Sequence, residues 1–133
     1  MDENKMRHLE FIQNVISRMA QNSFLLKGWT VTLVSALFIF ANTKDIDNSY
    51  LIVAYIPIFF FWILDSYFLH EEKLFRKMYD SVRIKLEKDI DFEMNPSIFK
   101  GEVDSWLEVV VSKTLILFYL PIFGVILIAL FYL

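Results

Sequence analysis

The run TLILFYLPIFGVILIALFYL, residues 114–133, decides the fold, because it contains no charged side chain. As a helix it would be about 30 Å long, which matches the hydrocarbon core of a bilayer. A helix on the surface of a soluble protein needs a polar face toward water, and this run has none. The run therefore predicts a transmembrane helix.

Two further apolar blocks precede this run. The first is SFLLKGWTVTLVSALFIFA (23–41), and the second, after a polar turn at 42–49, covers 50–68. Each is long enough to cross the hydrocarbon core. Apolar residues make up 56% of the chain, more than a soluble domain of 133 residues can bury. We therefore expect an all-α membrane protein with three transmembrane helices and a hairpin at 23–69.

Two charged segments flank these blocks and keep a helical period. In residues 1–22 the apolar side chains recur every three or four positions, as Leu9, Ile12, Val15, Ile16 and Met19. The region 70–113 begins with a similar helix to about residue 90, whose apolar face carries Phe75, Met78, Val82 and Leu86. No Pro or Gly separates either helix from its membrane block. We therefore expect both membrane helices to continue into amphipathic helices that pack together.

The second half of the 70–113 region begins with a turn signal. Asn95-Pro96-Ser97 predicts a turn with Ser97 as the helix N-cap. A short amphipathic helix then carries Ile98, Phe99, Val103, Trp106 and Leu107.

Lysine and arginine are concentrated in residues 1–22 and 66–113, whereas the turn at 42–49 has one lysine and the C-terminus has none. Positively charged flanks stay in the cytoplasm. This predicts a multi-pass membrane protein with its N-terminus and amphipathic helices in the cytoplasm and its C-terminus outside.

Signatures of catalysis and of metal binding are missing from the sequence. There is no cysteine, the three glycines form no phosphate-binding loop, and His8 and His70 each stand alone without a second ligand at metal-binding spacing. We therefore expect a protein that is not an enzyme and that has no metal site and no cofactor.

Small residues form a stripe on the first membrane helix. Gly28, Thr32 and Ala36 recur every fourth position with Ser35 beside them, a spacing that lets helix backbones approach closely in lipid. The stripe either packs against another helix of the same chain or lines a narrow pore in a homo-oligomer.

Asp65 adjoins the second membrane block without a polar spacer. It lies at a pore mouth, pairs with Lys27, or is exposed to water at the membrane surface. Pro57 and Pro121 lie in similar stretches, YIPIF and YLPIF, and predict a kink in the second and third membrane helices. These four residues are the candidates for gating or for contact with the membrane interface.

Lys73, Arg76, Lys77 and Arg83 form a basic stripe after the second membrane helix. The stripe has three interpretations: a topology signal, an attraction to anionic lipid head groups, or a site for a phosphate-bearing ligand.

The stretches 18–38 and 56–83 resemble a family of small bacterial multi-helix membrane proteins whose function is not characterised. The shared features are Lys27-Gly28-Trp29 at the start of the first span and Trp62, Asp65 and Tyr67 in a Trp-x-x-Asp-x-Tyr motif. The layout is also similar to the transmembrane effectors of bacterial anti-phage systems of the Hailong type or the cyclic-oligonucleotide type. That resemblance implies a protein of the bacterial inner membrane that permeabilises it under the control of a nucleotide or oligonucleotide ligand. Three membrane helices and a small cytoplasmic region bury little surface on their own, so we expect a homo-oligomer.

We therefore hypothesise an oligomeric pore, with a tetramer as the expected assembly, gated through its cytoplasmic helices by such a ligand or by a cytoplasmic regulatory protein. The alternative is a membrane anchor that does not conduct and recruits a cytoplasmic partner.

Overall fold

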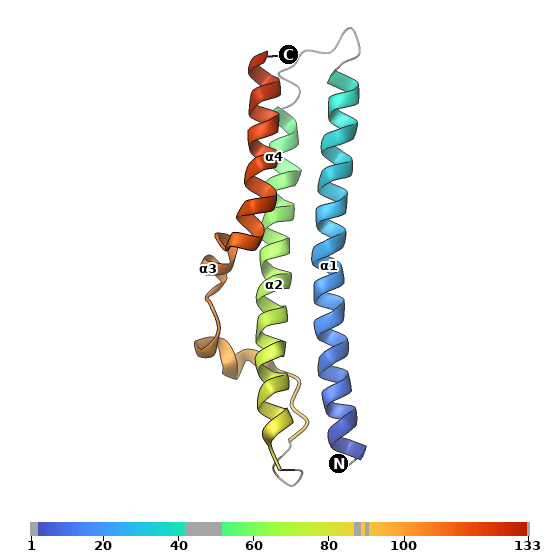
Figure 1. Ribbon diagram of the computed structural model, residues 1–133, viewed down its shortest axis with the longest axis vertical. Coiled ribbons are helices and arrows are strands. Elements are labelled where there is room, and N and C mark those ends of the chain that lie inside the picture. Colours follow the sequence, from blue (N-terminus) through green and yellow to red (C-terminus); the bar gives the residue numbers. More distant parts are fainter. Residues whose placement is uncertain (1–2, 42–51, 87–88, 90, 133) are drawn as a thin grey trace.

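The computed structural model describes residues 3–41, 52–86, 89 and 91–132 and consists of helices in these parts (Figure 1). The elements are α1 (Glu3–Ala41), α2 (Tyr55–Ile84), the 3-10 helix η3 (Pro96–Glu102), α3 (Trp106–Val110) and α4 (Lys113–Tyr132). Figure 1 shows α1 and α2 side by side over their lengths, with α4 beside the half of α2 that is remote from the N-terminus.

Three of these helices, α1, α2 and α4, are long and apolar enough to cross a membrane. The prediction of three such helices is confirmed. The 39 residues of α1 correspond to about 58 Å, nearly twice the thickness of the hydrocarbon core. The segments 1–22 and 23–41 thus form one continuous helix from Glu3 onward, as the absence of a helix breaker predicted.

The charged halves of α1 and α2 pack against each other through apolar side chains. Their shared core consists of buried side chains from α1, α2 and η3: Leu9, Ile12, Ile16, Leu74, Phe75, Met78, Val82 and Phe99. We call this part of the molecule, with the segment 91–102, the charged end. A second apolar cluster joins α2 to α3 and α4 and includes Ile58, Val109, Leu115 and Tyr119.

The predicted helix over 70–90 is too long. It ends at Ile84, where Lys85 adopts an extended backbone, and Leu86 is 63% exposed rather than part of the apolar face. Phe99 of η3 supplies the neighbouring part of the core instead.

The kink expected at Pro57 is also wrong. Within the described residues α2 begins at Tyr55, so Pro57 lies in the first turn, where backbone N–H groups have no partner within the helix. A proline there disturbs no helical hydrogen bond. Pro121, in contrast, lies inside α4. The expected polar turn at 42–49 and the start of the second block at Tyr50 lie outside the described residues.

The connection between the charged end and α4 differs from the sequence expectation in two respects. The N-cap of η3 is Asn95, whose side chain accepts a hydrogen bond from the backbone N–H of Ser97, and Ser97 itself is not the cap. The amphipathic segment is not one helix with one buried face, because Phe99 is buried whereas Ile98 and Leu107 are exposed.

Candidate functional site at the junction of the spans

Asp65 lies in α2, in the part of the helix that is apolar enough to cross a membrane. His70, at the start of the charged half of α2, is five positions further on, which corresponds to about 8 Å along the helix. The Asp65 side chain is 0% exposed. A carboxylate inside a membrane span needs hydrogen-bond partners or an opposite charge, because lipid supplies neither.

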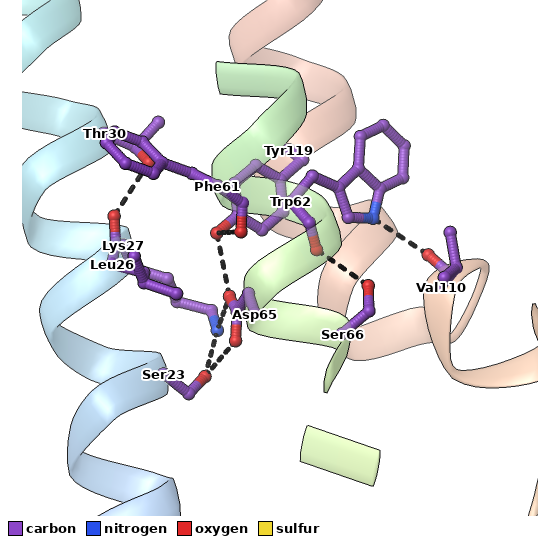
Figure 2. Close-up of polar contacts among 10 residues, drawn as sticks. All are labelled: Ser23, Leu26, Lys27, Thr30, Phe61, Trp62, Asp65, Ser66, Val110 and Tyr119. Carbon is purple, nitrogen blue, oxygen red and sulfur yellow. Dashed lines mark hydrogen bonds and ion pairs between the residues drawn. The ribbon is translucent and has the colours of Figure 1, made fainter. Parts of the chain in front are cut away.

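Residues from the other two spans supply these partners (Figure 2). From α1, Lys27 Nζ lies 2.5 Å from Asp65 Oδ2, and the hydroxyl of Ser23 donates to Oδ1. From α4, the Tyr119 hydroxyl donates to Oδ2 over 2.8 Å. Lys27 also donates to Ser23 Oγ over 2.8 Å. One carboxylate therefore holds all three spans together, and we call Ser23, Lys27, Asp65 and Tyr119 the Asp65 junction.

Aromatic rings close the α4 side of the junction. The rings of Tyr119 and Trp62 stack with their centroids 5.5 Å apart and their planes 4° from parallel. Trp62 in turn donates its indole N–H to the backbone oxygen of Val110 over 2.9 Å, so that the short helix α3 is attached to the same wall. Phe118, which also belongs to α4, contacts the lysine: Lys27 Nζ lies 5.7 Å from the centre of the Phe118 ring.

The stability of the junction depends on the pairing of Asp65 with Lys27. Desolvating two charges costs several kcal/mol per ion, and their mutual attraction offsets that cost only in good geometry. Here the Asp65 carboxylate is fully buried, whereas the Lys27 side chain is 22% exposed and retains access to the surroundings. Removal of Lys27 and removal of Asp65 are therefore expected to lower the free energy of unfolding by different amounts.

The predicted contact of Lys27 with Asp65 is confirmed, and the alternative of a water-exposed Asp65 is wrong. The sequence interpretation did not include Ser23 and Tyr119 in the site. Ser23 was the first residue of an apolar block, and Tyr119 resembled an ordinary core aromatic in α4. The i, i+4 spacing of Ser23 and Lys27 was the one available signal, because it places both side chains on the same face of a helix.

The small-residue stripe is exposed over Gly28 and Thr32, whereas Ser35 borders a hollow that Pro121 and Ile122 of α4 also line. Gly28, Thr32 and Ser35 are exposed and Ala36 is half-buried. A β-carbon built on Gly28 would meet no described atom outside its own helix within 4 Å. The Thr32 hydroxyl donates to the carbonyl of Gly28 in its own helix. In the described residues, the Gly28–Thr32 part therefore does not pack against α2 or α4 of the same chain.

The basic stripe on α2 carries its own acidic partners. Lys73 lies 3.5 Å from Asp104, Arg76 lies 3.0 Å from Glu72, and Arg83 lies 3.8 Å from Asp80. Lys77 is exposed on the same stretch. These pairs reduce the positive potential that a phosphate-bearing ligand would meet there.

A hollow of about 570 Å³ lies elsewhere on the charged end, between the first turns of α1 and the segment around Phe92. Its lining consists of Asn4, Arg7, His8, Phe11, Phe92 and Met94. His8 is 2% exposed, with Nε2 3.1 Å from the backbone oxygen of Glu93, and its buried Nδ1 has no hydrogen-bond partner among the described residues. Phe92 has a positive φ of 59° and lies against the imidazole, 5.3 Å between ring centres.

Within the described residues, no group of three or more His, Asp or Glu side chains could hold a metal ion. Comparisons of this chain with protein-family models, with curated proteins and with solved structures found no match. The function therefore has to be argued from the geometry of the junction and of the charged end.

Proposed function

We propose that this protein is an oligomeric membrane pore, an ion-channel-like effector gated through its charged end. The observation that carries the proposal is the Asp65 junction, in which a fully buried carboxylate pairs with a partly exposed lysine and joins the three apolar helices. Ionisable residues inside spans are expensive, and they commonly mark a conduction or gating function.

The two longest helices connect the charged end to the Asp65 junction. α1 is continuous from Glu3 to Ala41 and α2 from Tyr55 to Ile84. Both therefore contribute to the core of the charged end and to the spans. A shift between the helices at the charged end would be transmitted along them to Lys27 and Asp65, because a packed helix pair moves as a body rather than deforming continuously.

Conduction requires more than one copy in this proposal. The junction of one chain is sealed by Trp62, Phe118 and Tyr119, so a path for ions would lie between chains. The exposed Gly28–Thr32–Ser35 face suits close contact between copies in lipid. The tetramer and the cytoplasmic location of the charged end, expected from the sequence, remain parts of this proposal.

The gating signal we propose is a nucleotide or oligonucleotide, as the effector-like layout implies. The hollow beside His8 offers such a ligand exposed aromatic rings, which the basic stripe does not, although Arg7 there lies 3.8 Å from Glu3. It combines the exposed ring of Phe11 with Arg7, and the adjoining hollow brings Arg18.

Ion flux from vesicles tests the proposal. Purified protein would be reconstituted into potassium-loaded liposomes as wild type, D65N and the matched control S66A. Ser66 is equally buried and adjacent, but its hydroxyl bonds to the carbonyl of Trp62 in its own helix. We expect D65N to release potassium at least about tenfold faster than wild type, since a loss of about 1.4 kcal/mol from the closed state suffices for that factor.

S66A should behave as wild type. Retention of potassium by both wild type and D65N, at the level of protein-free vesicles, would contradict the pore.

A second candidate function is a membrane anchor that does not conduct and recruits a partner protein. The observation that favours it is the pair of exposed rings, Phe11 and Phe92, on the charged end. Aromatic side chains of this kind are enriched at the centres of protein interfaces. An anchor predicts impermeable vesicles for every variant together with loss of partner binding in F11A.

A further inference from the structure

The short helix α3 lies at the level where the spans meet the charged end. It ends at Val110, and α4 begins at Lys113. The backbone oxygen of Val110 accepts the indole N–H of Trp62, one turn before Asp65 in α2, and Val109 is buried in the cluster of the spans. Figure 1 shows α3 beside α2, next to the first turn of α4. The contact with Trp62 of α2 and the connection to α4 therefore hold α3 beside the start of α4.

The side of α3 that faces away from the protein is apolar. Leu107 is 69% exposed, Val111 is 61% exposed and Trp106 is 38% exposed. Leu107 and Val111 are four residues apart and so share a face, since residues i and i+4 are neighbours on a helical surface. Three apolar side chains on so short a segment would be unfavourable in water.

We propose that α3 is an interfacial helix whose Trp106, Leu107 and Val111 are covered by the boundary between lipid head groups and acyl chains. α4 follows α3 after Ser112, and its exposed apolar side chains, such as Leu117 and Leu120, would contact lipid beyond the exposed Lys113 and Thr114. Amphipathic segments bury their apolar face by about 5–10 Å at this boundary. Tryptophan favours the same depth, because its ring has an apolar body and a polar N–H.

The charges around the segment fit this placement. Lys100 and Lys113, which precede and follow α3 in the chain, are exposed and suit phosphate head groups. Glu102 and Asp104 are also exposed before α3, and Asp104 lies 3.5 Å from Lys73. The acidic side chain of Glu108 is also exposed, and it lies about 100° around the helix from Leu107, so it can face water while Leu107 faces lipid. The boundary, with acyl chains on one side and water on the other, accommodates both.

An interfacial α3 has a mechanical consequence. It contacts α2 through Trp62, and it runs into α4 through Ser112, whose carbonyl accepts hydrogen bonds from the N–H groups of Leu115 and Ile116. The packing of lipids at this surface would therefore act on the two helices that flank the Asp65 junction. The inference rests on membrane insertion and not on conduction.

Single-cysteine labelling tests the inference cleanly, because the chain contains no cysteine. L107C and V111C would be labelled with the polarity-sensitive fluorophore NBD and reconstituted into phosphatidylcholine vesicles. E108C is the control on the same helix. L86C is the control for an equally exposed apolar side chain at the charged end, 63% exposed. Quenching would be measured with nitroxides on the lipid head group, with nitroxides at the ends of the acyl chains, and with iodide in the water.

We expect lipid nitroxides to quench the labels at 107 and 111 at least about threefold more than the label at 86, with the head-group nitroxide more effective than the chain-end nitroxide. Iodide should show the opposite order. Equal lipid quenching at 107 and 86 would overturn the proposal. Protection of 107 from both lipid nitroxides and iodide would also overturn it and would assign the surface to a second copy. Neither result depends on ion flux, so the pore proposal stands or falls separately.

Discussion

Asp65 and Lys27 form one contact, but they occupy different environments. The carboxylate accepts hydrogen bonds from three side chains and is fully buried, whereas the lysine is partly exposed and has a flexible stem that can extend toward the head groups. Removing the lysine leaves a buried anion with two hydroxyl donors. Removing the carboxylate leaves a cation that can move. The two losses are therefore unequal.

A double-mutant cycle measures this difference. We expect K27M to lower the free energy of unfolding by about 3–5 kcal/mol, since it leaves an uncompensated buried charge. D65N should cost less than K27M. The double variant K27M/D65N should be more stable than K27M, because no charge then remains at the junction. Unfolding in detergent micelles, followed by circular dichroism, gives the four values. Equal losses in both single variants would contradict the asymmetry.

Two tyrosines donate hydrogen bonds to different acceptors, one charged and one neutral, so that the contributions of the two bonds can be compared. The Tyr119 hydroxyl donates to the carboxylate of Asp65, and the Tyr55 hydroxyl donates to the backbone oxygen of Phe123 over 2.9 Å. Replacement by phenylalanine keeps each ring and its stacking. We expect Y119F to destabilise by about 2 kcal/mol and Y55F by about 1 kcal/mol, since bonds to charged groups contribute more. The same micelle unfolding assay reports both, and an order reversed between the two would show that Asp65 is not charged.

At the scale of the helices, the charged end and the spans have separate apolar cores. The core of the charged end includes Met78 and Ile12, whereas the core of the spans includes Ile126. α1 and α2 connect the two cores only by continuing through both. Partial unfolding of the charged end alone is therefore expected to be the lowest-energy opening of the protein, because its helices can fray into water whereas spans cannot.

Met78→Ala tests the independence of the two cores. Met78 is 2% exposed, and its truncation should lower the stability of the charged end by about 2–4 kcal/mol. Hydrogen exchange followed by mass spectrometry should then show faster exchange in 3–22 and 70–84 and unchanged exchange in 114–131. The control M6A removes an exposed methionine from α1 and should change neither region. Faster exchange throughout α4 in M78A would show that the protein unfolds as one unit.

Sequence patterns within single helices predicted much of this fold. The features that they did not predict depend on contacts between helices. The lengths of the spans and the continuity of α1 follow from local composition. The end of α2 at Ile84 does not, because the period continues to Leu86 while the structure fills the core with Phe99 from a distant segment. Likewise, Lys27 and Asp65 are conspicuous as charges in apolar blocks. The contribution of Tyr119 depends on the register of α4 against α2, which no local pattern encodes.

For the whole molecule, the main question is which surface one copy would present to another. Gly28 and Thr32 are exposed on the helix that carries Lys27, and a β-carbon added at Gly28 would meet no described atom outside that helix within 4 Å. If copies meet there, assembly would position every Asp65 junction around one axis. A weak shift in each chain would then be repeated in all of them.

Gly28→Leu tests this contact without disturbing the single chain. No described atom outside α1 lies within 4 Å of the added β-carbon, and leucine is a better helix former than glycine by about 0.5–1 kcal/mol. The fold should therefore remain intact while the larger side chain keeps neighbouring helices apart. We expect native mass spectrometry in detergent to show fewer copies for G28L than for wild type. The matched control is G124L, on α4, where an added β-carbon also meets nothing within 4 Å in the described structure. An unchanged copy number in G28L, or an equal loss in G124L, would remove α1 from the contact and place the axis of the assembly elsewhere.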